Sequence, residues 1–284
     1  VLVVFMFGED VYRLFEAGVN YFISKPEEPS AFFSSRRKFI GQLALGLAAI
    51  PFISILYGIT KGKYNFKVLK YTLYFEDLPS AFDGYQITQI SDIHSGSFDN
   101  KEKIEYAVDL VNQQASNVIM FTGDLVNNLA SEMDGYWSLF AQLKAPLGVI
   151  SITGNHDYAD YVQWESLDQK RANFEKLKSV HARMGWRLLM NQHVVVTRGE
   201  SSIGVIGVEN WSAKSRFPKY GDLKTAYSGC EQIPFSILLS HDPSHWRAEV
   251  LEKYPSVALT LSGHTHGMQF GFEIPGLQWS PVQY

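Results

Sequence analysis

The sequence has a single cysteine, Cys230, in 284 residues, and this scarcity excludes two kinds of chemistry. One thiol can form neither a disulfide framework nor a thiolate metal cluster. Basic residues are also in the minority, since 25 Lys and Arg against 29 Asp and Glu give a formal net charge of -4. That balance, with no basic stripe interleaved with aromatic residues, argues against a nucleic-acid-binding surface.

Charged side chains are absent from residues 39–60, where Gln42 is the only strongly polar side chain and Pro51 the only helix breaker. The run is long enough to cross the hydrocarbon core of a bilayer. The basic cluster before it, residues 36–38, resembles a twin-arginine export signal or the positive flank of a membrane anchor. We predict a transmembrane or signal-anchor helix over 39–60, with the bulk of the chain extracytoplasmic. A buried core helix is the alternative.

We assign residues 1–63 to a membrane-associated segment and residues 64–284 to a soluble α/β domain. The chain begins at Val1, inside an apolar run, and we expect it to be a fragment of a longer protein with a truncated C-terminus. Residues 10–22 have a helical apolar period that fits an interfacial helix and a plain surface helix equally. Residues 25–34, with two prolines, are predicted to form a linker.

The soluble part alternates apolar β-prone runs with helical patterns. The strands expected from these runs are 68–75, 86–90, 118–122, 149–153, 186–189, 194–197, 203–208, 235–239 and 257–261. Helices are expected after the capping box of Asp99 and Glu102, around 133–143, and over 170–184. We expect the strands between 186 and 208 to form a second sheet. Residues 267–284, rich in Gly and Pro, are predicted to be a loop whose partner strands have been cut off.

Polar side chains close five of these predicted strands. Residues 118–122 indicate a strand buried on both faces, with Gly123 and Asp124 at its carboxyl end. Ligands bind at that edge of an open α/β sheet. The side chains in equivalent positions are the candidate metal ligands Asp92, His94, Asp124, Asn155, His241, His264 and His266.

This donor set mixes nitrogen and oxygen, which suits Zn, Mn or Fe rather than Ca. Asp124 has two oxygens and can bridge two ions. Two cations about 3.5–4 Å apart would activate a bridging hydroxide for in-line attack at phosphorus. His156 is suited to donate a proton to the leaving oxygen or to stabilise charge on it. Each motif alone is weak, and a lone D-x-H or H-x-H is incidental about four times in five.

Jointly, the motifs resemble those of the calcineurin-like metallophosphoesterases, and the resemblance covers roughly residues 73–269. The matching motifs are Ser91-Asp92-Ile93-His94, Gly123-Asp124, Gly154-Asn155-His156-Asp157, Ser240-His241 and Gly263-His264-Thr265-His266. The sequence before the first motif is most similar to membrane-linked bacterial phosphodiesterases of this family.

The resemblance implies an α/β fold in which two mixed β-sheets pack as a sandwich flanked by helices. It also implies a dinuclear centre. The ligands of the first ion would be Asp92, His94, Asp124 and His266. The ligands of the second ion would be Asp124, Asn155, His241 and His264. His156 would be the acid.

Two departures narrow the expected function. Protein serine/threonine phosphatases of the family carry Asp and Arg after the second motif, where this chain has Asn127 and Asn128. The missing guanidinium removes a bidentate phosphate clamp and argues against a phosphoprotein substrate. The missing carboxylate leaves the partner that orients His156 unidentified. His94 argues against the tyrosinate-iron site of purple acid phosphatases.

The leading hypothesis is a dinuclear-metal hydrolase of a phosphoester or pyrophosphate bond, in particular a membrane phosphodiesterase acting on a phosphorylated small molecule or a lipid-linked substrate. The alternatives are a catalytically silent membrane sensor that keeps the metal site, and an enzyme freed by cleavage of the apolar segment. His181 and His193 are expected to be surface or structural residues. Trp211, Phe217 and Tyr220 lie in a loop that fits either a substrate groove or core packing.

Overall fold

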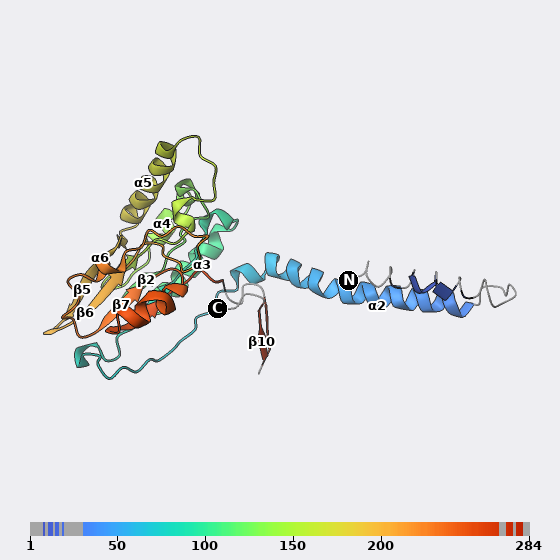
Figure 1. Cartoon of the computed structure of the whole chain (residues 1–284), viewed down its shortest axis with the longest axis horizontal. Coiled ribbons are helices and arrows are strands. Elements are labelled where there is room, and N and C mark those ends of the chain that lie inside the picture. The colour runs from blue at the N-terminus through green and yellow to red at the C-terminus, as the bar shows by residue number, and fades with distance from the viewer. Residues whose placement is uncertain are drawn as a thin grey trace. The chain divides into compact units, whose positions relative to one another are not determined.

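The computed structural model describes residues 31–266 and, outside that range, residues 8, 11–13, 15, 16, 19, 271–274 and 277–280. The chain divides into two compact units, Val1–Lys70 and Tyr71–Tyr284 (Figure 1). The described residues before position 20 are helical, and among them Val11, Phe15 and Val19 are exposed.

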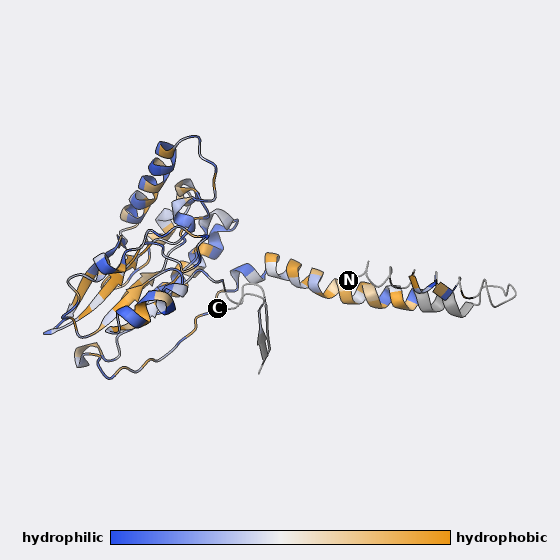
Figure 2. Cartoon of the chain, viewed as in Figure 1, coloured by the Kyte–Doolittle hydropathy of each residue, from blue (hydrophilic) through white to orange (hydrophobic). Residues whose placement is uncertain are grey.

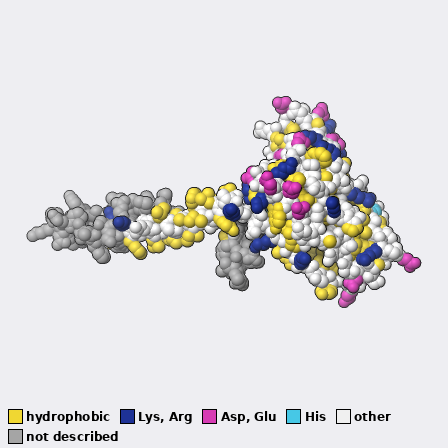
Figure 3. All heavy atoms as spheres, turned by 180° about the vertical axis from the view of Figure 1, so that it is seen from behind, with side chains coloured by type: hydrophobic (Ala, Val, Ile, Leu, Met, Phe, Trp, Pro, Cys, Tyr) yellow, Lys and Arg dark blue, Asp and Glu magenta, His cyan; other side chains and the backbone are white. Residues whose placement is uncertain are grey.

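The first unit is dominated by the helix α2, Ala31–Thr60, which runs through Pro51 without a break and is followed by the 3-10 turn η1, Gly62–Tyr64. The predicted apolar helix over 39–60 lies within it, and residues 38–64 are long and apolar enough to cross a membrane. In Figure 2 much of this helix has the orange of hydrophobic residues, and in Figure 3 yellow hydrophobic side chains lie along it. The predicted linker is wrong for residues 31–34, which are helical, and its first part lies outside the described residues.

The second unit contains two four-stranded sheets. The first has the order β1-β2-β3-β4, and every strand pair in it is parallel. Its strands are Ile87–Ile90, Val118–Phe121, Val149–Ser151 and Arg187–Leu188. The helices and turns joined to it are η2 Ser80–Phe82, η3 Ser95–Ser97, α3 Lys101–Asn112, η4 Ala130–Met133, α4 Trp137–Phe140, η5 His156–Tyr158 and α5 Leu167–Arg183.

The second sheet has the order β5-β6-β7-β8 and is mixed, because β5 is antiparallel to β6 while the other pairs are parallel. Its strands are Gln192–Arg198, Ser201–Gly207, Ser236–Leu239 and Val257–Leu261. The helical elements around it are α6 Leu223–Tyr227, the π-helical turn η6 Trp246–Val250 and α7 Leu251–Lys253.

The two sheets share one apolar core, which confirms the sandwich. The prediction that both sheets are mixed is wrong for the first sheet, whose described strand pairs are all parallel. Val118 and Met120 of β2 pack into a cluster with Val205 of β6 and Ile237 of β7. The opposite face of β2 is also buried, since Phe121 contacts Trp186 there. Burial on both faces explains why β2 is apolar at every position.

Several predicted elements differ in the structure. The strand predicted at 68–75 is absent, and β4 pairs with β3 in the first sheet rather than joining the second. Asn100, rather than Asp99, caps α3, because its side chain accepts from the amide of Lys103. The predicted C-terminal loop instead contains an antiparallel pair of strands, β9 Phe272–Ile274 and β10 Leu277–Trp279.

Parallel pairing explains how distant segments meet. The strands β1, β2 and β3 run in the same direction, so the chain leaves all three at one edge of the first sheet. The strands β7 and β8 likewise end together, and the amide of Gly263 donates to the oxygen of His241. The side chain of Gln89 joins the two edges, because its Nε2 donates to Thr122 Oγ1 and to the main-chain oxygen of Ser262.

Candidate metal centre

The turn after β2 holds Asp124 in a tightly packed backbone. Gly123 has φ +98°, and a Cβ there would lie 2.5 Å from the amide nitrogen of Gly154. The fully buried carboxylate of Asp157 accepts from the amides of Asp124 at 3.0 Å, Leu125 at 2.8 Å and Gly154 at 2.8 Å. These bonds join the turn after β2 to the turn after β3 and fix the direction of the Asp124 side chain.

Left-handed backbone conformations are concentrated at the candidate ligands. A positive φ is uncommon for residues other than glycine, and strain of this kind persists mainly at functional sites, where the surrounding structure enforces it. The candidate ligands with positive φ are Asp92 at 51°, His94 at 47°, Asp124 at 60°, His264 at 72° and His266 at 47°.

One group of donors gathers around His94. Its Nε2 lies 3.1 Å from Nε2 of His266, 3.6 Å from Oδ2 of Asp124 and 3.9 Å from Oδ1 of Asp92. Asp92 Oδ1 lies 3.3 Å from His266 Nε2. Two imidazole nitrogens and two carboxylate oxygens therefore point at one small region.

A second group gathers around His241. Its Nε2 lies 3.1 Å from Oδ2 of Asp124 and 3.1 Å from Oδ1 of Asn155. The same amide oxygen lies 2.8 Å from Nδ1 of His264. Asp124 belongs to both groups, and one oxygen, Oδ2, faces a histidine of each. The structure thus brings together all seven sequence-predicted residues.

The imidazole rings have the hydrogen-bond partners that metal-binding histidines need. The Nδ1 of His241 donates to the main-chain oxygen of Thr122 at 2.8 Å, so Nε2 is the nitrogen directed at Asp124 and Asn155. For His264, Nε2 lies 3.4 Å from Asp242, so Nδ1 is the nitrogen left to bind. Metal-binding histidines usually have such an outer partner on the other ring nitrogen. The donor set therefore fits divalent cations that accept mixed nitrogen and oxygen ligands.

The charges in this crevice depend strongly on one another. Burial opposes the charged form of His241, but the neighbouring Asp124 carboxylate outweighs it and raises the pKa of this histidine to about 9. Burial likewise opposes ionisation of Asp92, yet a hydrogen bond from His266 and the His241 charge hold the pKa of that carboxyl well below its usual range. Carboxylates paired with positive charge in a buried site are what a cation would also stabilise.

His156 lies beside the donors on η5. Its ring meets that of His94 edge to face at 4.8 Å and that of Tyr161 at 4.8 Å. Its Nδ1 lies 2.8 Å from the main-chain oxygen of Asn127, and its amide donates to Asp124 Oδ1. The partner of this ring is thus a backbone carbonyl.

Sequence reasoning missed three carboxylates that support the site. Asp157 holds two of the turns, and Asp242 faces His264. Glu132 accepts from the amides of Asn127 at 2.6 Å and Asn128 at 3.0 Å, which fixes the segment that orients His156. Asp157 and Asp242 directly follow candidate site residues in the sequence, and that adjacency was the available signal. Glu132 gave none.

The residues expected to be structural or ambiguous are also placed. His181 is buried, with Nδ1 3.1 Å from Ser151 Oγ, and His193 is half-buried, with Nδ1 3.0 Å from the main-chain oxygen of Ala226. Neither of these hydrogen-bond partners is a candidate ligand, and both histidines are structural. Trp211 stacks on His245 at 4.2 Å, whereas Phe217 lies edge to face on His264 at 5.0 Å. The loop therefore both packs against the fold and lines the site.

Two family models match this chain. Residues 85–268 match the calcineurin-like phosphoesterase family, and residues 1–63 match a family described as "Probable Calcineurin-like phosphoesterase, transmembrane domain". The first match includes every candidate ligand. The second covers residues before the soluble domain and supports association with a membrane.

The chain is also similar to curated proteins that are named as metallophosphoesterases. A "Transmembrane protein with metallophosphoesterase domain" from Danio rerio is 33% identical over 227 residues, which are 78% of this chain and 49% of that protein. An uncharacterized metallophosphoesterase from Bacillus subtilis is 29% identical over 194 residues, 68% of this chain and 62% of that protein. The chain thus spans about half the length of the first relative and 62% of the second.

Among solved structures, TT1561 of Thermus thermophilus is similar with a TM-score of 0.43 and 14% identity, over 63% of this chain and 80% of that one. The family match extends over more than half of the chain and includes the five motifs whose side chains converge in the structure. The chain therefore belongs to the calcineurin-like phosphoesterases, a family of metal-dependent hydrolases of phosphoesters, and it is membrane-associated.

Proposed function

We propose that this chain hydrolyses a phosphoester or pyrophosphate bond at a site that holds two divalent cations, Mn, Zn or Fe. The observation that carries the proposal is the position of Asp124. Its Oδ2 lies 3.6 Å from Nε2 of His94 and 3.1 Å from Nε2 of His241, one histidine from each donor group. A carboxylate oxygen placed between two such groups is suited to bridge two ions.

The proposed ligands divide between the two groups of donors. The first cation would be held by Asp92, His94, Asp124 and His266. The second would be held by Asp124, Asn155, His241 and His264. Bound there, two cations would polarise the phosphoryl oxygens and supply a water-derived nucleophile at neutral pH.

The remaining chemistry belongs to the protein itself. Because the Asn127 carbonyl accepts from Nδ1 of His156, the opposite ring nitrogen is available to carry the proton that a leaving oxygen needs. The edge contact with His94 keeps this ring beside the first donor group. His156 is therefore the proposed general acid, and Asn127 and Glu132 position it.

We further propose that residues 1–63 are the membrane-associated segment, that residues 64–284 are the catalytic domain, and that this domain is extracytoplasmic. The basic residues before the apolar run of α2 support this orientation, since positive flanks stay on the cytoplasmic side. A reporter fused after Lys70 tests it, and a cytoplasmic signal would reverse the topology. An enzyme in this position is suited to a phosphorylated small molecule or a lipid-linked substrate.

The decisive test is hydrolysis by the whole chain in detergent, loaded with Mn or Zn, on aryl monoester, diester and pyrophosphate substrates. We expect metal-dependent turnover of a diester or a pyrophosphate. A chain that binds two equivalents of metal yet hydrolyses none of these substrates would instead be a silent sensor. Sequencing the mature N-terminus separates a retained anchor from a cleaved export signal.

A further inference from the structure

We propose that the loop of residues 211–221 forms a second phosphate-binding subsite in which Arg216, stacked on Phe217, pairs with a phosphate next to the one being cleaved. The inference rests on the proposed function and makes it more specific, because it selects substrates with two adjacent phosphates, the pyrophosphate class.

Both ends of this loop are anchored to the fold. Trp211 stacks on the buried ring of His245, and the amide of Ala213 donates to Ser244 Oγ at 3.0 Å. At the other end, the amide of Tyr220 donates to the oxygen of Asn210 at 2.9 Å. The residues between these anchors are therefore held at a fixed place beside the metal centre.

The middle of the loop reaches the candidate ligands. The ring of Phe217 lies edge to face on that of His264 at 5.0 Å, and the guanidinium carbon of Arg216 lies 4.7 Å from the centre of the Phe217 ring. The Phe217 ring thus contacts both the Arg216 guanidinium and the proposed ligand His264. Stacking of this kind holds a guanidinium in place without neutralising it.

Tyr161, in the loop after η5, contacts both a proposed ligand and the proposed acid. Its hydroxyl accepts from Nδ2 of Asn155 at 2.8 Å, and its ring packs on His156. Aromatic side chains of two loops, Tyr161 and Phe217, therefore contact residues of the site, and Arg216 lies over the second of them.

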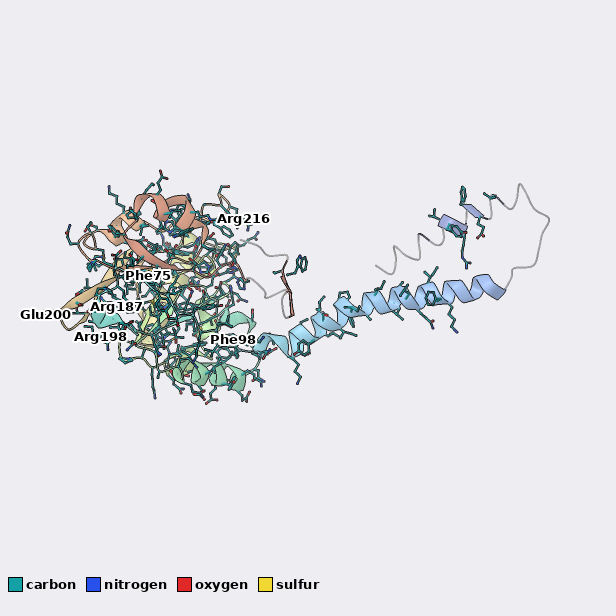
Figure 4. The ribbon with its side chains drawn as sticks, turned by 90° about the horizontal axis from the view of Figure 1, so that it is seen from below. Phe75, Phe98, Arg187, Arg198, Glu200 and Arg216 are labelled. Atoms are coloured by element: carbon teal, nitrogen blue, oxygen red, sulfur yellow. The ribbon has the colours of Figure 1, made fainter. Side chains whose placement is uncertain are left out.

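The charge of Arg216 is available for a ligand. Over residues 31–266, this guanidinium forms no ion pair, although five surface ion pairs of Lys or Arg occur there. Figure 4 shows Arg216 at the periphery of the folded unit, in an exposed position. A planar guanidinium matches two phosphate oxygens and is a strong partner for them.

The turn after β2 offers no arginine for phosphate. It carries Asn127 and Asn128, which supply no positive charge. Separation by the Phe217 ring keeps Arg216 out of the donor groups themselves. A guanidinium in that position suits the phosphate that follows the scissile one and not the scissile phosphate held by the cations.

The test measures binding, so that it does not depend on turnover. The full chain in detergent, loaded with Mn, is titrated with methylenediphosphonate and with methylphosphonate by calorimetry. We expect Arg216→Ala to weaken binding of the diphosphonate by about 10- to 100-fold, the range for a lost hydrogen bond to a charged group, and to leave methylphosphonate binding unchanged. Arg216→Lys should restore part of the lost diphosphonate affinity, because lysine keeps the positive charge but cannot pair with two phosphate oxygens as the planar guanidinium does.

Lys214→Ala is the matched control, since it removes one exposed positive charge from the same loop. It should bind both probes like the unmodified chain. An equal loss for both probes, no loss in Arg216→Ala, or an equal loss in Lys214→Ala would each overturn the subsite. An unmodified chain that hydrolyses nothing would refute the proposed function alone, because selective diphosphonate binding through Arg216 would still be measurable.

Discussion

His156 Nδ1 lies 2.8 Å from the main-chain oxygen of Asn127, so a backbone carbonyl orients the proposed acid. A carbonyl can only accept, and this contact therefore fixes the proton on Nδ1. Because the partner is main chain, the side chain at position 127 is free to vary. The Asn in place of the carboxylate found in protein phosphatases of the family thus does not leave His156 without an orienting group.

The first prediction concerns this histidine. His156→Ala should lower turnover by about 10²–10⁴-fold, the usual contribution of a general acid, while the chain keeps both metal ions. Turnover on a diester and metal content by mass spectrometry are the measurements. Asn127→Ala is the matched control, since it retains the carbonyl and loses only a side-chain bond to Ser97. A loss of metal in His156→Ala would show that this residue is a ligand and not the acid.

The second prediction concerns Asp124. Asp124→Asn keeps the size of the side chain but removes the charge that both donor groups share. We expect activity to be abolished and the metal content to fall towards one ion or none, measured on the purified chain after dialysis. Asp134→Asn, a change at an exposed carboxylate paired with Lys176, should alter neither quantity. Full activity in Asp124→Asn would end the dinuclear proposal.

The third prediction concerns the carboxylate behind His264. Asp242 lies 3.4 Å from Nε2 of His264 and is buried. Because such outer partners set the tautomer and basicity of a ligand, Asp242→Asn should lower metal affinity or activity by about 10- to 100-fold. Competition with a metal-ion chelator measures the affinity. Asp222→Asn changes an exposed N-cap of α6 to another good cap, and its metal affinity should stay that of the unmodified chain.

The sequence predicted the two sheets, the long apolar helix and the convergence of the seven candidate ligands, because these depend on patterns that a single chain displays. An apolar run such as β2 ends where its polar ligand begins, and parallel strands bring such ends to one edge. The pairing of β4 with the first sheet could not be predicted, since a strand as short as Arg187–Leu188 carries no periodic signal. Pairing also requires a partner, and the apolar residues around Tyr71, predicted as an edge strand, remain exposed.

The groups that support the site could not be predicted from the sequence for a related reason. Glu132 and Asp242 act on neighbours through three-dimensional contacts, and their residue types alone are ordinary in a turn. The orienting partner of His156 could not have been found by its side chain at all, because it is the Asn127 carbonyl. Main-chain partners leave no trace in residue identity, whereas the ligands themselves are restricted to a few residue types.

The last prediction concerns the loss of folding stability at low pH. His181, which lies outside the candidate site, contributes to this loss. Full burial disfavours the charged imidazole and lowers the pKa of His181 to about 3 from its ordinary 6.5. Between those two values the unfolded chain binds the proton and the folded chain does not, so stability falls as pH falls from 6.5. Above 6.5 both states are neutral and this histidine adds no pH dependence. We expect His181→Asn to be less stable at pH 7, because it loses ring contacts with Trp186, but to lose less of its remaining stability on acidification.

Thermal midpoints of the whole chain in detergent at pH 7 and pH 5 measure this difference, and His193→Asn, at a half-buried histidine, is the control. An unchanged drop between the two pH values in His181→Asn would show that the acid sensitivity arises elsewhere.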